Sequence, residues 1–305
     1  MKKKKKIALI TGAAGQDGII LSKILLQNKY KVFGIIKKKN YLNKVKKVKY
    51  IQVNVLFEDK IKKILKKIQP DFLIHFGSEN PSFIDKKNNS VFYKKNKKQT
   101  INLINSLINL KLKTTFIFAN SSKIFYKKKG IIKVNEKNKF SKNSAYSKFR
   151  VEILNYMVSL KKRINFKFVN LILFNHDSKF RNKKFLFPRI IKSIKEDELN
   201  LINKIYKKNI FADFSHAEDI CNAIYLLIKK GITIDNLILS SNKLTSVNKI
   251  INYILRKTKK KLITDKIISK KEKNLIGDNS LAKKILKWKI NKNVYQAIDE
   301  IIGIT

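Results

Sequence analysis

Cysteine, proline and glycine are scarce in this chain, and each scarcity has a consequence. Cys221 is the single cysteine, so no intrachain disulfide and no cysteine-based metal cluster can form, which fits a reducing cytoplasm. Three prolines and nine glycines among 305 residues leave few signals for linkers. No His, Cys, Asp and Glu spacing suggests a metal site, so we expect none.

Long apolar runs are also missing. A membrane-spanning helix needs about 20 consecutive apolar residues, and no window of this sequence approaches that length. Lysines at 2–6 followed by apolar residues 7–10 resemble the start of a signal peptide, but the apolar run ends in a glycine turn. We therefore expect residues 7–11 to form a strand, and the protein to be cytoplasmic with no membrane partner.

Negative charge is the third scarcity. Lys and Arg number 70 against 21 Asp and Glu, a formal net charge of +49. Such an excess can indicate a nucleic-acid or membrane-surface partner, but these lysines are spread along the whole chain and accompany abundant Asn and Ile, as in an AT-rich coding sequence. We therefore expect salt-sensitive, nonspecific attraction to polyanions and no specific nucleic-acid site.

A glycine motif near the start carries the strongest functional signal. An apolar run over residues 7–11 meets glycines at three-residue spacing, and an amphipathic helix pattern follows from Gln16. In parallel α/β folds such glycines let the turn tighten and let the backbone approach a pyrophosphate at the helix N-terminus. The alternative is an ordinary glycine turn. The candidate cofactor-binding residues here are Thr11, Gly12, Gly15, Gln16, Asp17 and Gly18.

Strand-like and helix-like runs alternate along the chain, which predicts a parallel sheet. The fold class is therefore α/β, a Rossmann-like doubly wound parallel sheet with a smaller C-terminal substrate-binding lobe. The expected strands are residues 7–11, 32–36, 50–53, 72–76, 115–119 and 166–174, and the expected helices between them are 19–27, 59–68, 100–110 and 144–161.

The second part of the chain is less clearly divided. We expect residues 1–177 to form the NADP-binding domain, with 205–232 returning to it, and 178–305 to form mainly the substrate-binding lobe. Later helices are predicted near 216–229, 246–256 and 281–287. Their expected N-caps are Ser215, Thr245 and Ser280.

Two positions bear on the choice of cofactor. The second strand ends in Ile36-Lys37-Lys38-Lys39, with no acid to hold a free ribose hydroxyl. We favour NADP, because a basic side chain here would bind its 2′-phosphate. Lys37 and Lys38 also fit a solvated basic loop. Asn54 follows the third strand and could hydrogen-bond an adenine edge or cap a turn.

Several segments in order resemble the extended short-chain dehydrogenase/reductase family, and within it the GDP-mannose 4,6-dehydratases. The Gln16-Asp17 pair between Gly15 and Gly18 is a more specific mark of this family than the glycines themselves. The resemblance runs across nearly the whole chain. It is carried by residues 8–12 and 15–18, by Gln69-Pro70-Asp71, by 173–178, by 213–219, by 275–278 and by 286–288.

The resemblance implies an activity. The family oxidises C4 of GDP-mannose with NADP, loses water across C5 and C6, and returns the hydride to C6. It implies Tyr146 as the base toward the 4-hydroxyl and Ser121 as the residue that orients the sugar, whereas an ordinary helix aromatic is the alternative for Tyr146. A free phenol has a pKa of about 10, so a base of this kind needs a neighbouring cation. A homo-oligomer is also implied.

Two catalytic positions depart from the family pattern. Arg150 stands where the family has the lysine four residues after the tyrosine, and a guanidinium keeps the charge but cannot give up its proton. Lys123 stands where the dehydratases have the glutamate that removes the C5 proton. A lysine at its reference pKa of about 10.4 is no base at pH 7. Glu136 is the nearest downstream acid.

Substrate contacts are implied by the segment after the sixth strand. Asn175, His176 and Ser178 match the family residues lining the sugar-nucleotide site, and Arg181 or Arg189 could bind the diphosphate by bidentate contacts. The resemblance makes a GDP-sugar the expected substrate, most simply GDP-mannose. Two alternatives remain open: an epimerase or reductase of the same family that does not eliminate water, and a catalytically degenerate protein that binds NADP and a nucleotide sugar.

Overall fold

A seven-stranded parallel sheet forms the centre of the molecule. The computed structural model describes residues 5–37, 44–78, 89–126, 130–261 and 273–303. The strand order is β10-β7-β5-β4-β1-β2-β3 and all the pairings are parallel, which confirms the predicted fold class. The strands are β1 (Ile7–Thr11), β2 (Lys31–Ile36), β3 (Lys49–Gln52), β4 (Phe72–His75), β5 (Thr115–Ser121), β7 (Phe168–Leu173) and β10 (Ile234–Leu239).

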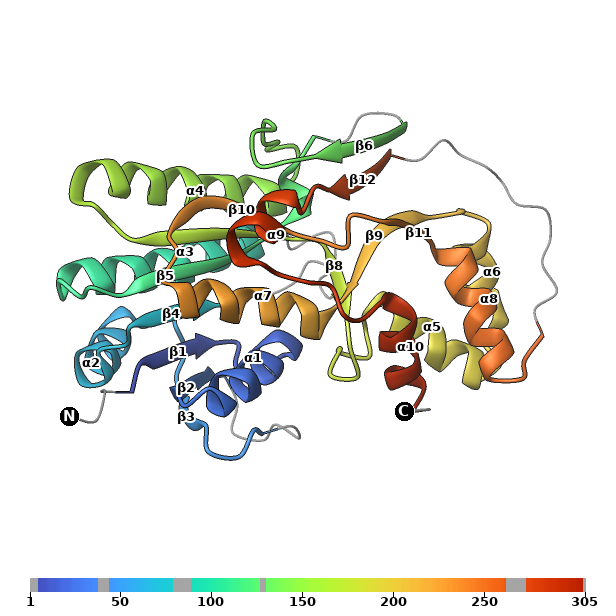
Figure 1. Ribbon diagram of the computed structural model, residues 1–305, viewed down its shortest axis with the longest axis horizontal. Helices are drawn as coiled ribbons and strands as arrows, with labels where there is room; N and C mark the ends of the chain where they lie inside the picture. The colour runs from blue at the N-terminus through green and yellow to red at the C-terminus, as the bar shows by residue number, and fades with distance from the viewer. Residues whose placement is uncertain (1–4, 38–43, 79–88, 127–129, 262–272, 304–305) are drawn as a thin grey trace.

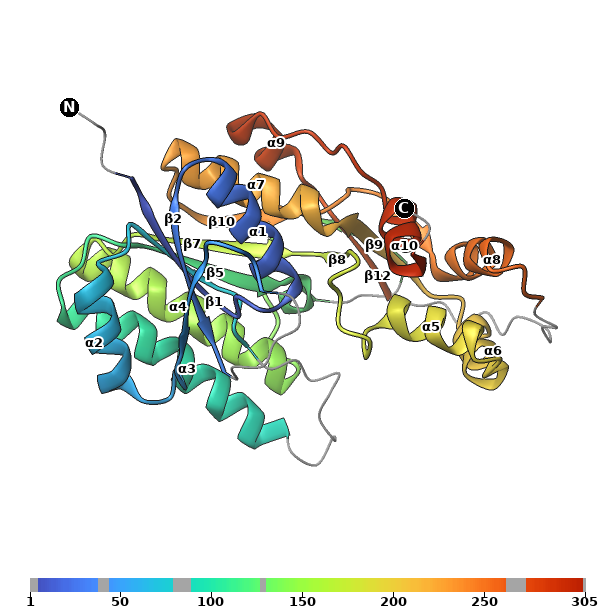
Figure 2. The same cartoon turned by 90° about the horizontal axis from the view of Figure 1, so that it is seen from below.

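Helices cover both faces of this sheet, as Figure 2 shows. Along β1, Ala8 and Ile10 are buried in the core on one face and Leu9 in the core on the other, because successive strand side chains alternate. The first face is covered by α1 (Gln16–Gln27), α7 (Ala217–Lys230) and α9 (Ser280–Leu286), and the second by α2 (Glu58–Ile68), α3 (Asn89–Asn109) and α4 (Ala145–Ile164).

A smaller lobe lies beside the carboxyl ends of the strands (Figure 1). Its own apolar core includes Phe187, Ile250 and Ile298, all fully buried. Its helices are α5 (Leu186–Lys195), α6 (Leu199–Tyr206), α8 (Val247–Lys257) and α10 (Val294–Ile302), and its strands are β8 (Asn175–Asp177), β9 (Phe211–His216) and β11 (Leu244–Ser246). A separate parallel pair joins β6 (Gly130–Val134) to β12 (Lys273–Gly277).

The strand order fixes where a ligand can bind. The chain runs from β1 outward through β2 to β3, then returns to place β4 on the opposite side of β1. Ligands of open parallel sheets bind at the carboxyl edge beside this reversal. The segments that follow β1, β4 and β5 meet there, and they contain Gly12, Gly77 and Ser122.

The three predicted helix caps are wrong by about one residue each. His216, not Ser215, caps α7, because its Nδ1 accepts a hydrogen bond from the Glu218 amide at 3.1 Å. Ser246, not Thr245, caps α8. In both cases the preceding strand continues through the predicted cap. Ser280 lies inside α9, whose N-cap Asn279 makes no side-chain capping bond.

All six predicted strands are present. In the central sheet the sequence pattern missed β10, and outside that sheet it missed β6, β8, β9, β11 and β12. The β10 segment begins with Ile-Asp-Asn before a short apolar run, which reads as a loop. No helix within the described ranges has both the length and the apolar character required to span a bilayer.

Candidate active site

The turn after β1 has a shape that only glycine permits. Gly12 has φ of +69°, and a Cβ there would lie 2.9 Å from the Gly77 nitrogen. A Cβ on Gly18 would lie 2.5 Å from the Gly12 oxygen, so α1 packs directly on the turn. The Gly15 amide closes the turn on the Gly12 carbonyl at 2.9 Å. This cradle leaves the N-terminus of α1 accessible to a diphosphate and fits the nucleotide cofactor that the sequence predicts.

A buried chain of hydrogen bonds supports the same turn from β4. Thr11 Oγ1 accepts from the Gly77 amide at 3.1 Å and lies 2.6 Å from His75 Nδ1. His75 Nε2 lies 3.0 Å from Thr100 Oγ1, whose own proton goes to the Asn96 carbonyl. These partners assign a neutral imidazole protonated at Nε2. Burial, with the charge of Arg150, lowers the pKa of His75 to about 3.

Tyr146 lies at the start of α4 beside two cations. A capping box fixes this helix end: the Ser147 amide donates to Ser144 Oγ at 3.0 Å, and the Ser144 amide donates to Ser147 Oγ at 3.1 Å. The Arg150 guanidinium carbon lies 4.5 Å from the centre of the Tyr146 ring, and Lys123 Nζ lies 5.4 Å from it. Both distances lie within the range of cation–π contacts, so two cations lie against this ring.

Arg150 is held in place by groups from two neighbouring strands. Its Nη1 donates to the Ala119 carbonyl of β5 at 2.7 Å, and its Nη2 donates to Ser78 Oγ, just after β4, at 3.2 Å. The residue is 4% exposed. The spacing of four between Tyr146 and Arg150 therefore does place them on one face of the helix, as the sequence indicates.

Ser121 and Lys123 follow the end of β5. Ser121 Oγ accepts from the Lys123 amide at 3.3 Å, which turns the chain into a short 3₁₀ segment. Glu136, the nearest downstream acid, accepts from the Ile238 amide of β10 at 2.9 Å. Among the described residues, no carboxylate contacts Tyr146.

A cavity of about 90 Å³ opens between β5 and the lobe. Among the described residues on its wall, Lys123 is the one with a charged side chain, and Asn175 lines the same cavity from β8. Asn175 also donates to the Asp213 carbonyl at 3.2 Å. The lining residues are Ser122, Lys123, Phe174, Asn175, Phe211, Ala212 and Leu275.

The other predicted substrate residues lie elsewhere. His176 is buried with its Nε2 3.1 Å from Asp17 Oδ1, and Ser178 donates to Gln16 Oε1 at 3.0 Å, so both face the start of α1. Arg181 Nε pairs with Asp177 Oδ1 at 2.9 Å. Arg189 is exposed on α5.

Of the three residues predicted to contact the adenosine end of the coenzyme, the structure describes Lys37 and Asn54. Lys37 directly follows β2 and is exposed, and Lys38 lies outside the described residues. Asn54 accepts from the Leu56 amide at 3.1 Å, which is the turn-capping role. Of the described side chains, no group of three or more His, Cys, Asp or Glu is arranged to hold a metal ion.

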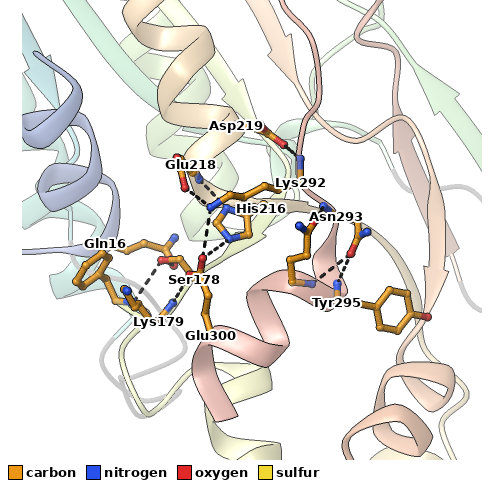
Figure 3. Close-up of polar contacts among 12 residues, drawn as sticks. Gln16, Ser178, Lys179, His216, Glu218, Asp219, Lys292, Asn293, Tyr295 and Glu300 are labelled. Atoms are coloured by element: carbon orange, nitrogen blue, oxygen red, sulfur yellow. Dashed lines mark hydrogen bonds and ion pairs between the residues drawn. The ribbon is translucent and has the colours of Figure 1, made fainter. Parts of the chain in front are cut away.

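Contacts that the sequence did not reveal join the C-terminal helix to β9 and to the segment after β8 (Figure 3). Glu300 of α10 lies 3.1 Å from His216 Nε2 and accepts from the Lys179 amide at 3.4 Å. Lys292 reaches the same carboxylate at 3.6 Å. Asn293 caps α10 in an Asn-x-x-Gln capping box, a signal that could have located this helix. No local pattern marks Glu300.

Comparison with known proteins gives a consistent result. A sequence model of the family described as GDP-mannose 4,6 dehydratase matches residues 9–301. The chain is 24% identical over 270 residues to GDP-mannose 4,6 dehydratase 2 of Caenorhabditis elegans, covering 82% of this chain and 70% of that protein. It is 26% identical over 261 residues to GDP-mannose 4,6-dehydratase of Yersinia enterocolitica, covering 79% and 69%. The chain thus spans about two thirds of the length of such relatives.

Solved structures share the whole fold. UDP-glucose 4-epimerase of Thermotoga maritima superposes with a TM-score of 0.82 at 16% identity, covering 97% of both chains. The dTDP-glucose 4,6-dehydratase of Bacillus anthracis, solved in complex with NAD, has a TM-score of 0.80 at 15% identity and covers 98% of this chain and 96% of that one.

The sheet, the glycine turn and these matches define an enzyme of the extended short-chain dehydrogenase/reductase class. Within that class, the chain belongs to the GDP-mannose 4,6-dehydratase family. The resemblance drawn from the sequence motifs is confirmed.

Proposed function

We propose that this protein is a nicotinamide-dependent enzyme that oxidises C4 of a GDP-linked sugar, and most simply a GDP-mannose 4,6-dehydratase. The observation that carries the proposal is the Tyr146 phenol, flanked by Arg150 and Lys123, at the sheet edge that also holds the glycine turn. A phenol beside cations can accept a proton from a hydroxyl, which is the first requirement of this chemistry.

Each residue has a defined role in the proposal. Tyr146 takes the proton of the sugar 4-hydroxyl, Arg150 stabilises the phenolate, and Ser121 orients the hydroxyl. The Gly12–Gly18 turn seats the coenzyme diphosphate, and Lys37 provides the charge that would select NADP. When bound, the coenzyme supplies the acceptor for the C4 hydride and the source from which it returns. Because a guanidinium does not give up its proton under ordinary conditions, Arg150 acts through charge and takes no part in proton transfer.

Dehydration makes a further demand on the site. Once C4 is a ketone, a base must remove the C5 proton while the C6 hydroxyl leaves with a proton as water. Lys123 occupies the position that faces the cavity, and Glu136 is held on β10. A second candidate function follows from these two observations: an epimerase or reductase that transfers hydride at C4 without eliminating water.

The substrate and the cell compartment belong to the same proposal. Asn175 on the wall of the cavity is the candidate contact to the sugar, and exposed Arg189 is the candidate contact to the diphosphate. The division into a coenzyme domain over residues 1–177, with 205–232 returning to it, and a substrate lobe over 178–305 remains our proposal. So do NADP as the coenzyme, a homo-oligomeric state and a cytoplasmic location.

Incubation with GDP-mannose and either NADP⁺ or NAD⁺ in deuterated water tests the proposal. We expect mass spectrometry to show a 4-keto-6-deoxy sugar nucleotide that has lost one water and carries deuterium from the solvent at C5. A C4 epimer, identified by NMR because it has the same mass as the substrate, or a 4-keto sugar formed with reduced coenzyme and without loss of water, would replace the dehydratase by the second candidate. Coenzyme binding with no turnover on a panel of nucleotide sugars would identify a binding protein and overturn both.

A further inference from the structure

The cavity between β5 and the lobe is rich in hydrogen-bond donors. Its polar lining residues are Ser122, Lys123 and Asn175, and the other four described residues on its wall are apolar. The Lys123 ammonium can only donate, and the Asn175 amide has one hydrogen left after its bond to the Asp213 carbonyl. A ligand group that enters this cavity therefore meets donors and a positive charge, and no carboxylate among those residues.

Lys123 also lacks an acidic partner. Its Nζ lies 5.4 Å from the centre of the Tyr146 ring, and in the part of the chain that the structure describes no Asp or Glu forms an ion pair with it. Glu136 accepts a hydrogen bond from β10 instead. Arg150 adds a second cation 4.5 Å from the same ring centre. The positive charge beside Tyr146 is thus not balanced by a carboxylate of the described residues.

The position of Tyr146 indicates which part of the sugar Lys123 can reach. In the proposed reaction the 4-hydroxyl lies against the Tyr146 hydroxyl, and C6 is only two bonds from C4. The C6 substituent therefore lies within reach of an ammonium beside the Tyr146 ring. C6 is also the carbon of a hexose that can become a carboxylate without opening the ring, whereas the neighbour on the other side, C3, carries a neutral hydroxyl.

An ammonium in this position favours a carboxylate over a hydroxyl. Hydrogen bonds between two ionised groups are shorter and stronger than those in which one group is neutral. Lys123 is exposed in the free protein, so its charge is hydrated there and costs the fold little. When a ligand displaces water from a cavity with mostly apolar walls, the attraction between the two charges is screened less.

We infer that Lys123 is a specificity-determining residue that binds a carboxylate at C6, so that the site selects a GDP-linked hexuronic acid over the corresponding neutral sugar. The inference rests on the proposed oxidation at C4 and gives the second candidate function, which eliminates no water, its substrate class. A hexuronic acid has no C6 hydroxyl to lose. It therefore requires no base at the position that Lys123 occupies, and Tyr146 and Arg150 keep their proposed roles.

GDP-mannose and GDP-mannuronic acid form a matched pair of probes, because they differ only in a hydroxymethyl group or a carboxylate on C5. With oxidised coenzyme present, NMR of the sugar protons measures the rate at which the wild-type protein converts each one at C4. We expect kcat/KM to be about tenfold higher, or more, for the uronic acid. The difference should lie mainly in KM, because the ion pair forms in the bound substrate as well as in the transition state.

Variants of Lys123 test whether this residue is the cause. Lys123→Gln keeps a donor but removes the charge, so we expect the two values of kcat/KM to become equal within about twofold. Lys123→Glu should reverse the preference, because like charges repel. Lys161→Gln is the matched control, since it removes the same charge at the far end of α4, where Lys161 pairs with Asp235. It should keep the wild-type preference, which separates a contact at Lys123 from general attraction by the net charge of +49.

Conversion of GDP-mannose at least as efficient as that of the uronic acid, or a preference that persists in Lys123→Gln, contradicts the inference but leaves oxidation at C4 standing. Failure to convert either sugar overturns the inference and the proposed function together. Should the Lys123 variants fail to fold, as circular dichroism would reveal, the C6 amide of GDP-mannuronic acid decides with the wild-type protein. This amide keeps the shape of the acid without its charge, so we expect its kcat/KM to be about tenfold lower. Equal values for the amide and the acid contradict the inference.

Discussion

Among single residues, Tyr146 is the one whose replacement we expect to cost most. In Tyr146→Phe the ring still packs beside Arg150 and Lys123, but no oxygen remains to take the proton of the sugar hydroxyl. We expect kcat to fall by a factor of about 10² to 10⁴, with the Kd of the coenzyme unchanged. Steady-state kinetics and fluorescence titration measure the two quantities.

Tyr225→Phe is a suitable control for that experiment. The Tyr225 hydroxyl donates to Asn28 Oδ1 at 2.6 Å on the outer side of α1 and α7. Losing it should leave kcat within about twofold, since it contacts no part of the site. A Tyr146→Phe enzyme as active as Tyr225→Phe would remove the phenol from the proposed mechanism.

The proposed function gives Lys123 a direct bearing on whether water is eliminated. Lys123→Glu places a carboxylate on the wall of the cavity beside Tyr146, and we expect the ratio of dehydrated product to total C4 oxidation to rise at least tenfold, because a base is supplied. Product analysis by mass spectrometry gives this ratio, and Lys123→Gln serves as the uncharged control. A ratio that falls in Lys123→Glu would mean that the lysine itself takes part in the elimination.

Part of this residue-level account could be read from the sequence. The glycine turn and the Tyr146–Arg150 pair follow from local spacing, and the structure has the turn and the shared helix face. The orientations of His176 and Ser178 could not be read in that way. They depend on a contact between β8 and α1. In this contact Gln16 Nε2 donates to the carbonyl of His176, which lies 160 residues further along the chain.

At the scale of secondary-structure elements, the start of α4 positions Tyr146, the proposed base. Ser144→Ala removes one half of the capping box, and we expect it to lower the free energy of unfolding by about 1 kcal/mol. Because Tyr146 is in the first turn of this helix, we also expect kcat to fall several-fold. Urea unfolding and steady-state kinetics measure the two effects.

Asn293→Ala provides the matched comparison. Asn293 caps α10 in a second capping box, with its Oδ1 accepting from the Tyr295 amide at 2.9 Å. We expect a similar loss of stability but a kcat close to that of the wild type, since α10 holds none of the proposed catalytic groups. Equal losses of kcat in both variants would show that capping of α4 has no special influence on Tyr146.

Periodicity predicted the elements of the sheet better than those of the lobe. Buried parallel strands such as β7 are continuous apolar runs that propensity identifies. By contrast, β8 and β11 have three residues each and are strands only because they pair with β9. Two of the three helix caps were misplaced for the same reason, since β9 and β11 extend through Ser215 and Thr245.

At the scale of the whole molecule, His75 makes the fold sensitive to acid. Its folded pKa is about 3, well below the unfolded value of 6.5, because the ring is buried and lies near the charge of Arg150. Between these two pH values the unfolded chain binds one more proton than the folded protein. Stability is therefore complete above pH 6.5 and falls as pH drops, by about 1.4 kcal/mol per pH unit for this one group.

Replacement by a side chain that does not titrate isolates this contribution. We expect His75→Gln to be less stable than the wild type at pH 7, and the difference between the two proteins to shrink as pH falls from 6 to 4. Urea unfolding at each pH measures it. A difference that stays constant over this range would mean that His75 is not the neutral, buried group that its bonds to Thr11 and Thr100 require.

The central claim is that the carboxyl edge of the sheet seats a nicotinamide coenzyme whose reactive ring faces Tyr146. A crystal structure of the protein soaked with excess NADPH, or with NADH, tests it most directly. The account predicts the diphosphate against the Gly12–Gly18 turn and the nicotinamide within reach of the Tyr146 hydroxyl. Electron density for the coenzyme at another site, or a Tyr146 hydroxyl directed away from the ring, would contradict it.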